Sequence, residues 1–245
     1  MRIALAAVGF ITGDTEYNKN KIIKTVNECR DKADLVLFGE TFLQGFECLS
    51  WNYEKDRGVA VSQDDPLISA VRETAKRNNI AVSFGYVEKE GDRLYSSQLT
   101  LGRDGHTINN YRRVSVGWKE SIADSHYCEG EAFERFEYEG RILSVGLCGD
   151  FWDDRFCEQE KQLKADIVLW PVYTDFNYNV WNSSMKYEYA GQSEKIGDRI
   201  LYVNSVCEET EAEEIARGGA VYFSDGRIVT EVAAGTENVL IVDIE

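Results

Sequence analysis

The sequence has few histidines, and the two present, His106 and His126, form no HxH or HExxH pattern. Histidine is a common zinc ligand and is the base of the Ser-His-Asp triad, so both chemistries are poorly supplied. A metal-dependent hydrolase built on Asp150, Asp153 and Asp154 is an alternative, but these aspartates have no further donors at ligand spacing. We therefore expect no metal and no cofactor.

Other absences bear on location and partners. No apolar run reaches 18 residues, so no membrane-spanning helix is predicted. The first apolar run, residues 2–10, gives way to Gly13-Asp14, which is typical of a strand and not of a signal peptide. The six cysteines include no CxxC pair, which favours free thiols and a cytoplasmic protein. The 27 basic and 43 acidic residues give a net charge of −16, which disfavours nucleic acid and anionic membranes as partners.

The 245 residues allow one domain, 1–245, with a sizeable core, and no linker or repeat divides them. Apolar runs predict strands, and apolar residues at helical spacing predict amphipathic helices. The strands expected are 2–10, 34–40, 80–87, 94–101, 107–111, 133–138, 141–147, 165–170 (closed by Pro171), 200–204, 220–223, 228–232 and 239–244. The helices expected are 18–32, 66–79, 156–164 and 181–196. A polar turn at 88–93 predicts a hairpin, and therefore a mixed sheet. Five glutamates between 208 and 214 predict an exposed loop.

Two of the predicted strands end in reactive side chains. Residues 34–40 end in Glu40, and the strand that begins at 141 ends in Cys148-Gly149-Asp150. A nucleophile followed by glycine at a strand end predicts a sharp turn, which exposes the side chain and leaves the next N–H free for an oxyanion. If the two strands are neighbours in one sheet, Glu40 can serve as general base for the thiol without histidine. The alternative is that Cys148 is a small buried hydrophobic residue.

Three motifs together extend this reading. Phe38-Gly39-Glu40, then Tyr111-Arg112-Arg113, then Gly146 to Asp150 resemble, in order and spacing, the glutamate, YRK and CxD motifs of the nitrilase superfamily, the carbon-nitrogen hydrolases. The resemblance covers nearly the whole chain. Its further landmarks are Gly13-Asp14 with Asn18 and Asn20, Asn79-Ile80, Gly85-Tyr86, Tyr95 to Ser97, Asp104-Gly105, Ala165-Asp166, Trp170-Pro171, Gly218-Gly219 and Asp225-Gly226.

The resemblance implies a fold and a site. The fold is an α/β, four-layer α-β-β-α sandwich with mixed sheets, often paired across a dimer interface. Cys148 is the nucleophile and Glu40 its general base, acting through a thioester. Gly149 supplies an N–H to the oxyanion, and the pocket walls expected are Phe46, Trp152 and Tyr173.

The chain departs from the family pattern at several positions. Arg113 stands where the family has its catalytic lysine; arginine keeps the positive charge in a larger, planar group. Lys119 is a possible substitute for the missing lysine. In an inactive site, Arg113 would merely pair with Glu40 or Glu120. Glu120, or failing that Glu129, is the expected second glutamate.

Glycine also replaces a proline before Glu40, at Gly39, and a commoner aromatic after Cys148, at Gly149. We expect both changes to enlarge or loosen the site.

We therefore expect a thiol amidohydrolase that cleaves a small linear amide or carbamoyl compound and releases ammonia or an amine. The alternatives are a nitrile-hydrolysing member and a non-catalytic binding protein that has lost the lysine. A nearby cation is expected to lower the pKa of Cys148 and make it reactive near neutral pH. Because the sequence ends directly after its last predicted strand, we expect a homodimer and not a larger assembly.

Overall fold

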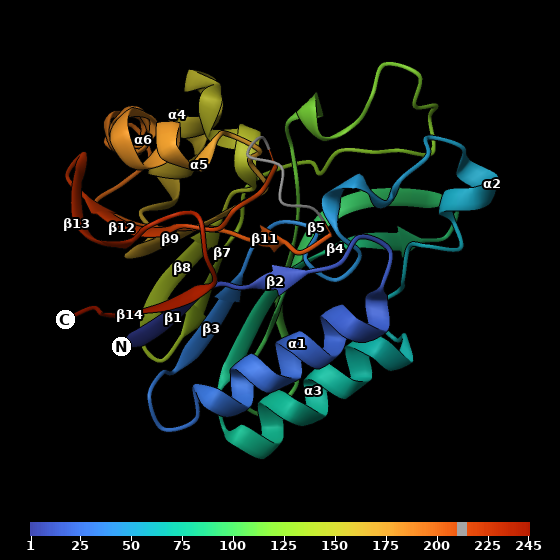
Figure 1. The fold of residues 1–245 in the computed structure, drawn as a ribbon, viewed down its shortest axis with the longest axis horizontal. Coiled ribbons are helices and arrows are strands. Elements are labelled where there is room, and N and C mark those ends of the chain that lie inside the picture. The colour runs from blue at the N-terminus through green and yellow to red at the C-terminus, as the bar shows by residue number, and fades with distance from the viewer. Residues whose placement is uncertain (210–214) are drawn as a thin grey trace.

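Two six-stranded sheets form the centre of the computed structural model, which describes residues 1–209 and 215–245 (Figure 1). The first sheet has the strand order β14-β1-β3-β4-β5-β6 and the second the order β13-β12-β10-β9-β8-β7. The first comprises β1 (Arg2–Ala7), β3 (Leu35–Phe38), β4 (Ala81–Glu90), β5 (Arg93–Leu101), β6 (Thr107–Arg112) and β14 (Asn238–Asp243). The second comprises β7 (Arg135–Tyr138), β8 (Arg141–Val145), β9 (Ile167–Val172), β10 (Arg199–Asn204), β12 (Ala220–Ser224) and β13 (Arg227–Val232). Short parallel strands β2 (Gly9–Phe10) and β11 (Val206–Cys207) pair separately.

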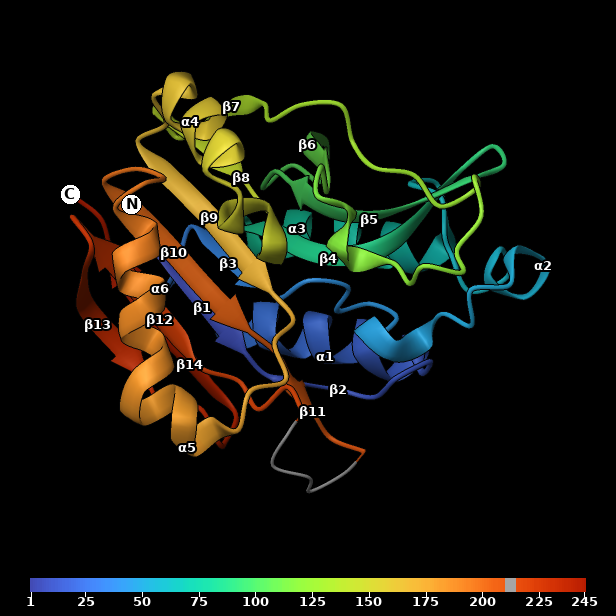
Figure 2. The same cartoon turned by 90° about the horizontal axis from the view of Figure 1, so that it is seen from above.

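Helices cover the outer face of each sheet. The helices α1 (Thr15–Glu28) and α3 (Pro66–Asn78) lie side by side on the first sheet, and α4 (Asp154–Leu163) and α6 (Lys186–Ser193) lie on the second (Figures 1 and 2). Both sheets are mixed. In the first, β1 runs parallel to β3 but antiparallel to β14. In the second, β10 runs parallel to β9 but antiparallel to β12. The predicted four-layer α-β-β-α sandwich is confirmed.

The alternation of side chains in β1 explains why it is apolar throughout. Ile3 and Leu5 belong to the core that includes side chains of the second sheet, whereas Ala4 and Ala6 belong to the core under α1 and α3. β3 repeats this alternation. A strand covered on both faces must be apolar at every position, and each buried aliphatic side chain contributes about 1.5–3 kcal/mol.

Local capping chemistry sets the helix ends. The Asp65 side chain accepts from Leu67 N–H, Pro66 occupies the first turn, and Asn79 ends α3 in a left-handed conformation. The helix expected at 18–32 instead begins at Thr15, because the Asp14 side chain accepts from Tyr17 N–H at 2.9 Å. Within the described chain, no helix is both long and apolar enough to cross a bilayer.

The Glu40 and Cys148 strands are not neighbours in one sheet, so the condition set in the sequence analysis is not met. β3 lies between β1 and β4 in the first sheet, and β8 lies between β7 and β9 in the second. The two strand ends therefore meet across the sandwich. A pattern of apolar residues locates a strand but does not say which sheet it joins.

Two local predictions also need correction. Pro171 does not close its strand: β9 continues to Val172, and Pro171 pairs with Val203 of β10. The proline is tolerated because β8 pairs with β9 only as far as Leu169, so one side of β9 has no ladder partner there. The helix expected at 181–196 is a continuous stretch of α5 (Tyr178–Val180), a π-helical turn (Trp181–Met185) and α6.

The glutamates expected in an exposed loop are only partly described. Glu208 pairs with Lys21 at 2.9 Å, and Glu209 accepts from Thr12 N–H at 2.9 Å. Positions 211, 213 and 214 lie outside the described residues. Glu208 and Glu209 thus hold α1 and the end of β2 to the segment after β11.

Candidate active site

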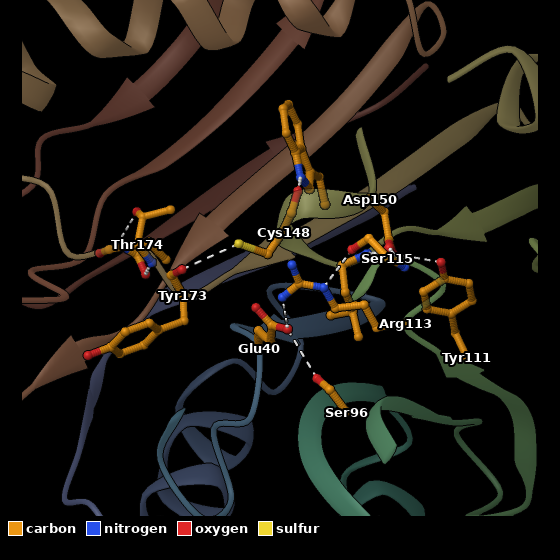
Figure 3. Close-up of polar contacts among 12 residues, drawn as sticks. Glu40, Ser96, Tyr111, Arg113, Ser115, Cys148, Asp150, Tyr173 and Thr174 are labelled. Atoms are coloured by element: carbon orange, nitrogen blue, oxygen red, sulfur yellow. Dashed lines mark hydrogen bonds and ion pairs between the residues drawn. The ribbon is translucent and has the colours of Figure 1, made fainter. Parts of the chain in front are cut away.

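Cys148 sits at the sharp turn that the sequence predicts. After β8 the chain enters a 3₁₀ turn, η3 (Cys148–Trp152), and Cys148 has a φ of +41°, which is costly for a residue with a side chain. The indole N–H of Trp170 donates to the Cys148 carbonyl oxygen at 3.0 Å and helps to hold this conformation. The thiol lies 3.4 Å from the Tyr173 carbonyl oxygen (Figure 3).

Glu40 follows β3, where the two sheets approach each other closely. A Cβ on Gly39 would lie 2.4 Å from Ser205 Oγ and 2.9 Å from the Val172 carbonyl oxygen. The Glu40 N–H donates to that same carbonyl at 3.2 Å. Gly39 therefore lets the first sheet contact the second, and the expectation that it loosens the site is wrong.

The Glu40 carboxylate is buried, and only one of its two oxygens has a hydrogen-bond partner among the described residues. Arg113 Nη1 lies 2.9 Å from Oε1, and the two side chains are 3% and 0% exposed. The Ser96 hydroxyl also donates to Oε1, at 3.0 Å. Oε2 is buried and has no hydrogen-bond partner among the described residues. Figure 3 places this carboxylate and the guanidinium beside Cys148. A buried, unpaired carboxylate oxygen next to a thiol is suited to accept its proton.

The Arg113 guanidinium has one donor nitrogen to spare. Its Nε donates to Ser115 Oγ at 2.8 Å and its Nη1 to Glu40. Nη2 has no acceptor in the described parts of the chain, and it lies where a side chain on Gly149 would begin, 2.4 Å from an ideal Cβ. The space left by Gly149 is thus filled by Arg113, and the expectation that this glycine enlarges the site is also wrong.

Asp150 ties three segments together beneath the nucleophile. Its Oδ2 accepts from the Tyr111 hydroxyl at 2.6 Å and from Leu147 N–H at 2.8 Å, and its Oδ1 accepts from Ser115 N–H at 2.8 Å. Burial raises the pKa of Asp150, and the Arg113 charge and these hydrogen bonds oppose that rise. Asp150 therefore fixes the Cys148 turn to β6 and to the loop that follows it.

The environment of Cys148 favours the neutral thiol. Burial, followed by the charge of Glu40, raises the pKa of Cys148 to about 12, and the opposing effect of Arg113 is smaller. Arg113 does lower the pKa of Cys148, as expected, but the expectation of a reactive thiolate near neutral pH is wrong, because burial and the Glu40 charge outweigh the cation. The Cys148 thiol therefore carries its proton at neutral pH.

The sequence profile of the family described as Carbon-nitrogen hydrolase matches residues 2–245. The chain belongs to this family. Its sequence is 26% identical over 172 residues to an (R)-stereoselective amidase of Pseudomonas sp., covering 69% of this chain and 59% of that protein. It is 22% identical to a glutamine-dependent NAD(+) synthetase of Aquifex aeolicus, covering 100% of this chain and 42% of that protein. The chain thus spans less than two thirds of the length of these relatives.

Solved structures show the same fold in this carbon-nitrogen hydrolase family. An amidase from Nesterenkonia sp. AN1 superposes with a TM-score of 0.80 at 21% identity, over 100% of this chain and 93% of that one. Another structure of that amidase shows the result of Michael addition of acrylamide at its active-site cysteine. At this level of identity the likeness establishes the nitrilase-superfamily sandwich.

The aromatic residues expected as pocket walls of this carbon-nitrogen hydrolase lie on segments near Cys148. Phe46 stacks on Tyr173, with centroids 4.6 Å apart and ring planes within 5°. Trp152 is 46% exposed and packs edge-on against Tyr189 at 5.0 Å. All three predicted wall residues therefore lie on segments next to Cys148.

The other charged candidates of this carbon-nitrogen hydrolase lie elsewhere. Lys119 Nζ is 2.5 Å from Glu129 and donates to the Tyr127 carbonyl at 2.8 Å. Lys119 and Glu129 line a cavity of about 1050 Å³ that neither Cys148 nor Glu40 lines. Lys119 therefore does not lie where it could replace the family's lysine beside Glu40 and Cys148. Glu120 is exposed and has no described contact with Arg113 or Glu40.

Sequence reasoning missed the serines that orient the charged pair. Ser96 holds Glu40 and Ser115 holds Arg113, and both follow from structure alone. Ser96 had a detectable signal, because a polar side chain on a buried strand must find a partner. Ser115 lies in the loop that follows β6 and gave no such signal.

The three aspartates of the metal hypothesis do not converge. Asp150 is occupied by Tyr111 and two backbone N–H groups, Asp153 pairs with Arg155 at 2.6 Å, and Asp154 pairs with Lys195 at 2.8 Å. Among the residues that the structure describes, no group of three histidine, cysteine, aspartate or glutamate side chains could hold a metal ion.

Proposed function

We propose that this chain is an amidase that hydrolyses a small, non-peptide amide or carbamoyl compound through a Cys148 thioester. The observation that carries the proposal is the Glu40 carboxylate. One of its oxygens is fixed by Arg113 and Ser96, and the other is buried and has no partner among the described residues. Figure 3 shows the carboxylate beside Cys148. Such a group is a fixed acceptor for the thiol proton.

In the acylation half, Glu40 Oε2 takes the Cys148 proton while Sγ attacks the amide carbon. The carbonyl π pair moves onto oxygen, and two donors that have no acceptor in the described structure, Arg113 Nη2 and the Gly149 N–H, are available to bind this oxyanion. Collapse breaks the C–N bond. The proton on Glu40 passes to the leaving nitrogen, which departs as ammonia or an amine, and the acyl group remains on sulfur.

In the second half, water attacks the thioester and gives a proton to Glu40. The same donors stabilise the second oxyanion, and its collapse breaks the C–S bond. The carboxylic acid leaves, and the proton on Glu40 returns to Cys148. Over the cycle, an amide and one water become an acid and ammonia or an amine, with no redox step.

Amides are preferred to nitriles for two reasons. An (R)-stereoselective amidase is among the relatives, and the Nesterenkonia amidase is a structural neighbour. A citrullinase from Francisella tularensis, 20% identical over 70% of this chain, supports carbamoyl compounds as a second class. Nitriles remain the alternative, since an aliphatic nitrilase of Rhodococcus rhodochrous is 22% identical over 95% of this chain.

A second candidate is a binding protein that has lost turnover. It is favoured by the Arg113–Glu40 pair, because a paired guanidinium and a thiol with a pKa of about 12 also describe a resting pocket without chemistry. In that case a small amide or acid would bind beside Phe46 and Trp152 and leave unchanged.

Ammonia and amine release from a panel of short amides, carbamoyl amino acids and nitriles decides between these functions. Wild type is compared with Cys148→Ala, which removes the nucleophile, and with Cys128→Ala as a matched control at a partly exposed cysteine outside the site. Release that Cys148→Ala abolishes and Cys128→Ala leaves intact supports the amidase. Thermal stabilisation by a panel member without its turnover supports the binding protein.

A homodimer and a cytoplasmic location are also part of the proposal. Four large apolar side chains are exposed on η3, just before α5 and along the α5–α6 stretch, namely Trp152, Phe176, Val180 and Tyr187. A second copy covering this face would bury them. All six cysteines are free, in keeping with a reducing compartment. Light scattering of wild type and of Val180→Asp/Tyr187→Asp tests the dimer: a monomeric wild type at micromolar concentration contradicts it.

A further inference from the structure

Gly149 lies directly against the guanidinium of Arg113. An ideal Cβ on Gly149 would be 2.4 Å from Nη2, 3.5 Å from Cζ and 3.6 Å from Ser115 Oγ. Real Cβ atoms essentially never come within 3.0 Å of such an atom. The φ of Gly149 is not in the left-handed region, so its backbone would accept an L side chain. The close obstacle to a side chain at this position is therefore Nη2.

The guanidinium is held in place and cannot simply move aside. Nη1 is tied to Glu40 and Nε to Ser115, and the Arg113 side chain is 3% exposed. A flexible arginine on a surface would yield to a new methyl group at little cost. Here any displacement must break a buried ion pair, a hydrogen bond or both.

We propose that Gly149 is a positioning residue matched to Arg113: the missing side chain after the nucleophile is what allows an arginine to carry the positive charge of this site. A lysine has no counterpart of Nη2, so with lysine at 113 the space beside residue 149 is empty and a side chain there is tolerated. Residues 113 and 149 then form two compatible pairs, arginine with glycine and lysine with a larger residue.

The pairing also sets where the two spare donors lie. Nη2 rests beside Gly149, whose own N–H has no acceptor in the described structure. This inference builds on the proposed amidase, in which both donors bind one oxyanion. A methyl group between them would push Nη2 away and separate the two donors.

A double-mutant cycle tests the pairing with wild type, Gly149→Ala, Arg113→Lys and Gly149→Ala/Arg113→Lys. The matched control is Gly191→Ala, because Gly191 lies in α6 and an added Cβ there would meet nothing within 4 Å. Three readouts are taken for each protein: turnover of the best amide, the rate of Cys148 alkylation by iodoacetamide from pH 7 to 10, and the midpoint of thermal unfolding.

We expect alanine to be harmful only beside arginine. In the wild-type background it lowers kcat about a hundredfold, since a displacement of about 1 Å in a catalytic group can cost that much. Alkylation slows at every pH, because the cation that lowers the pKa of Cys148 has moved away, and the unfolding midpoint falls. In the Arg113→Lys background the same alanine changes kcat by no more than about twofold, as for uncoupled sites. Gly191→Ala leaves turnover and alkylation unchanged and does not lower the unfolding midpoint, since alanine is more favourable than glycine within a helix.

An equal effect of alanine in both backgrounds, on alkylation and on thermal unfolding, would overturn the pairing. So would a Gly149→Ala protein that keeps wild-type turnover and alkylation. Neither alkylation nor thermal unfolding needs a substrate. If no amide is turned over by wild type while the alkylation and stability cycles still show coupling, the proposed function fails and the pairing stands.

Discussion

Arg113 Nη1 lies 2.9 Å from Glu40 Oε1, and the second oxygen of that buried carboxylate accepts no hydrogen bond from any described residue. The pair is therefore asymmetric. One oxygen anchors the guanidinium, and the other faces the nucleophile. Four predictions follow from this site and its surroundings, in addition to the pairing of Arg113 with Gly149.

Glu40→Gln should change turnover and thiol reactivity in opposite directions. Loss of the general base lowers kcat by about a hundredfold to ten-thousandfold. Because the Glu40 charge helps to raise the pKa of Cys148 and Arg113 lowers it, the glutamine variant should have a lower thiol pKa. Its Cys148 should then be alkylated faster than that of wild type at pH 8, as measured by mass spectrometry of the modified peptide. Slower alkylation in Glu40→Gln would contradict the electrostatic picture.

Arg113→Lys and Arg113→Met should separate charge from shape. Lysine keeps the charge, but its single ammonium nitrogen cannot take the places of the three guanidinium nitrogens that serve Ser115, Glu40 and the oxyanion. We therefore expect kcat to fall about tenfold to a hundredfold. Methionine leaves Glu40 buried without its partner and should lower the free energy of unfolding by about 3–5 kcal/mol, measured by urea denaturation. Lys119→Met is the control, because Lys119 pairs with Glu129 away from the site. A loss of turnover in Lys119→Met would restore Lys119 as the substitute lysine.

Tyr111→Phe should weaken both stability and turnover through Asp150. The variant removes a 2.6 Å hydrogen bond to a buried carboxylate, which should cost about 1.5–3 kcal/mol in urea denaturation. Tyr53→Phe is matched in chemistry but loses only an exposed 3.3 Å bond to Asp92, so its stability should be that of wild type. Equal effects of the two variants would mean that the Asp150 network contributes little.

Glu160→Gln should remove a pH dependence of stability. Burial raises the pKa of Glu160 in α4 to about 7, and its bond from the Ser144 hydroxyl only partly offsets this. The folded protein therefore holds a proton that the unfolded chain releases at lower pH, so wild-type stability falls as pH rises from about 4.5 to about 7. Relative to Glu160→Gln, the fall should approach about 3 kcal/mol between pH 4.5 and 8. Glu158→Gln, on the exposed face of α4, should track wild type; a flat difference between wild type and Glu160→Gln would contradict the raised pKa.

The parts of this structure that the sequence could predict are those with local causes. Asp65, Pro66 and Asn79 delimit α3 through capping and backbone preferences, and the turn at Cys148 follows from an apolar run that ends in cysteine and glycine. The family motifs then picked out Glu40, Arg113 and Cys148, which the fold brings together.

The parts that it could not predict depend on contacts between distant segments. Membership of β3 and β8 in different sheets, the approach of Gly39 to Ser205, and the filling of the Gly149 space by Arg113 are all tertiary relationships. The prediction of a low pKa for Cys148 was wrong for the same reason. A nearby cation gives a thiol a low net pKa only where burial and a neighbouring carboxylate do not outweigh it.

The division of the site between two sheets has a mechanical consequence. Glu40, the proposed base, belongs to one half of the sandwich and Cys148, the proposed nucleophile, to the other, and the backbone at Gly39 contacts the second half directly. In the proposed mechanism, turnover therefore depends on the alignment of the two halves. A slide of one sheet over the other by a fraction of a residue would separate Glu40 from Cys148 while every strand, helix and hydrogen-bonded ladder was still intact.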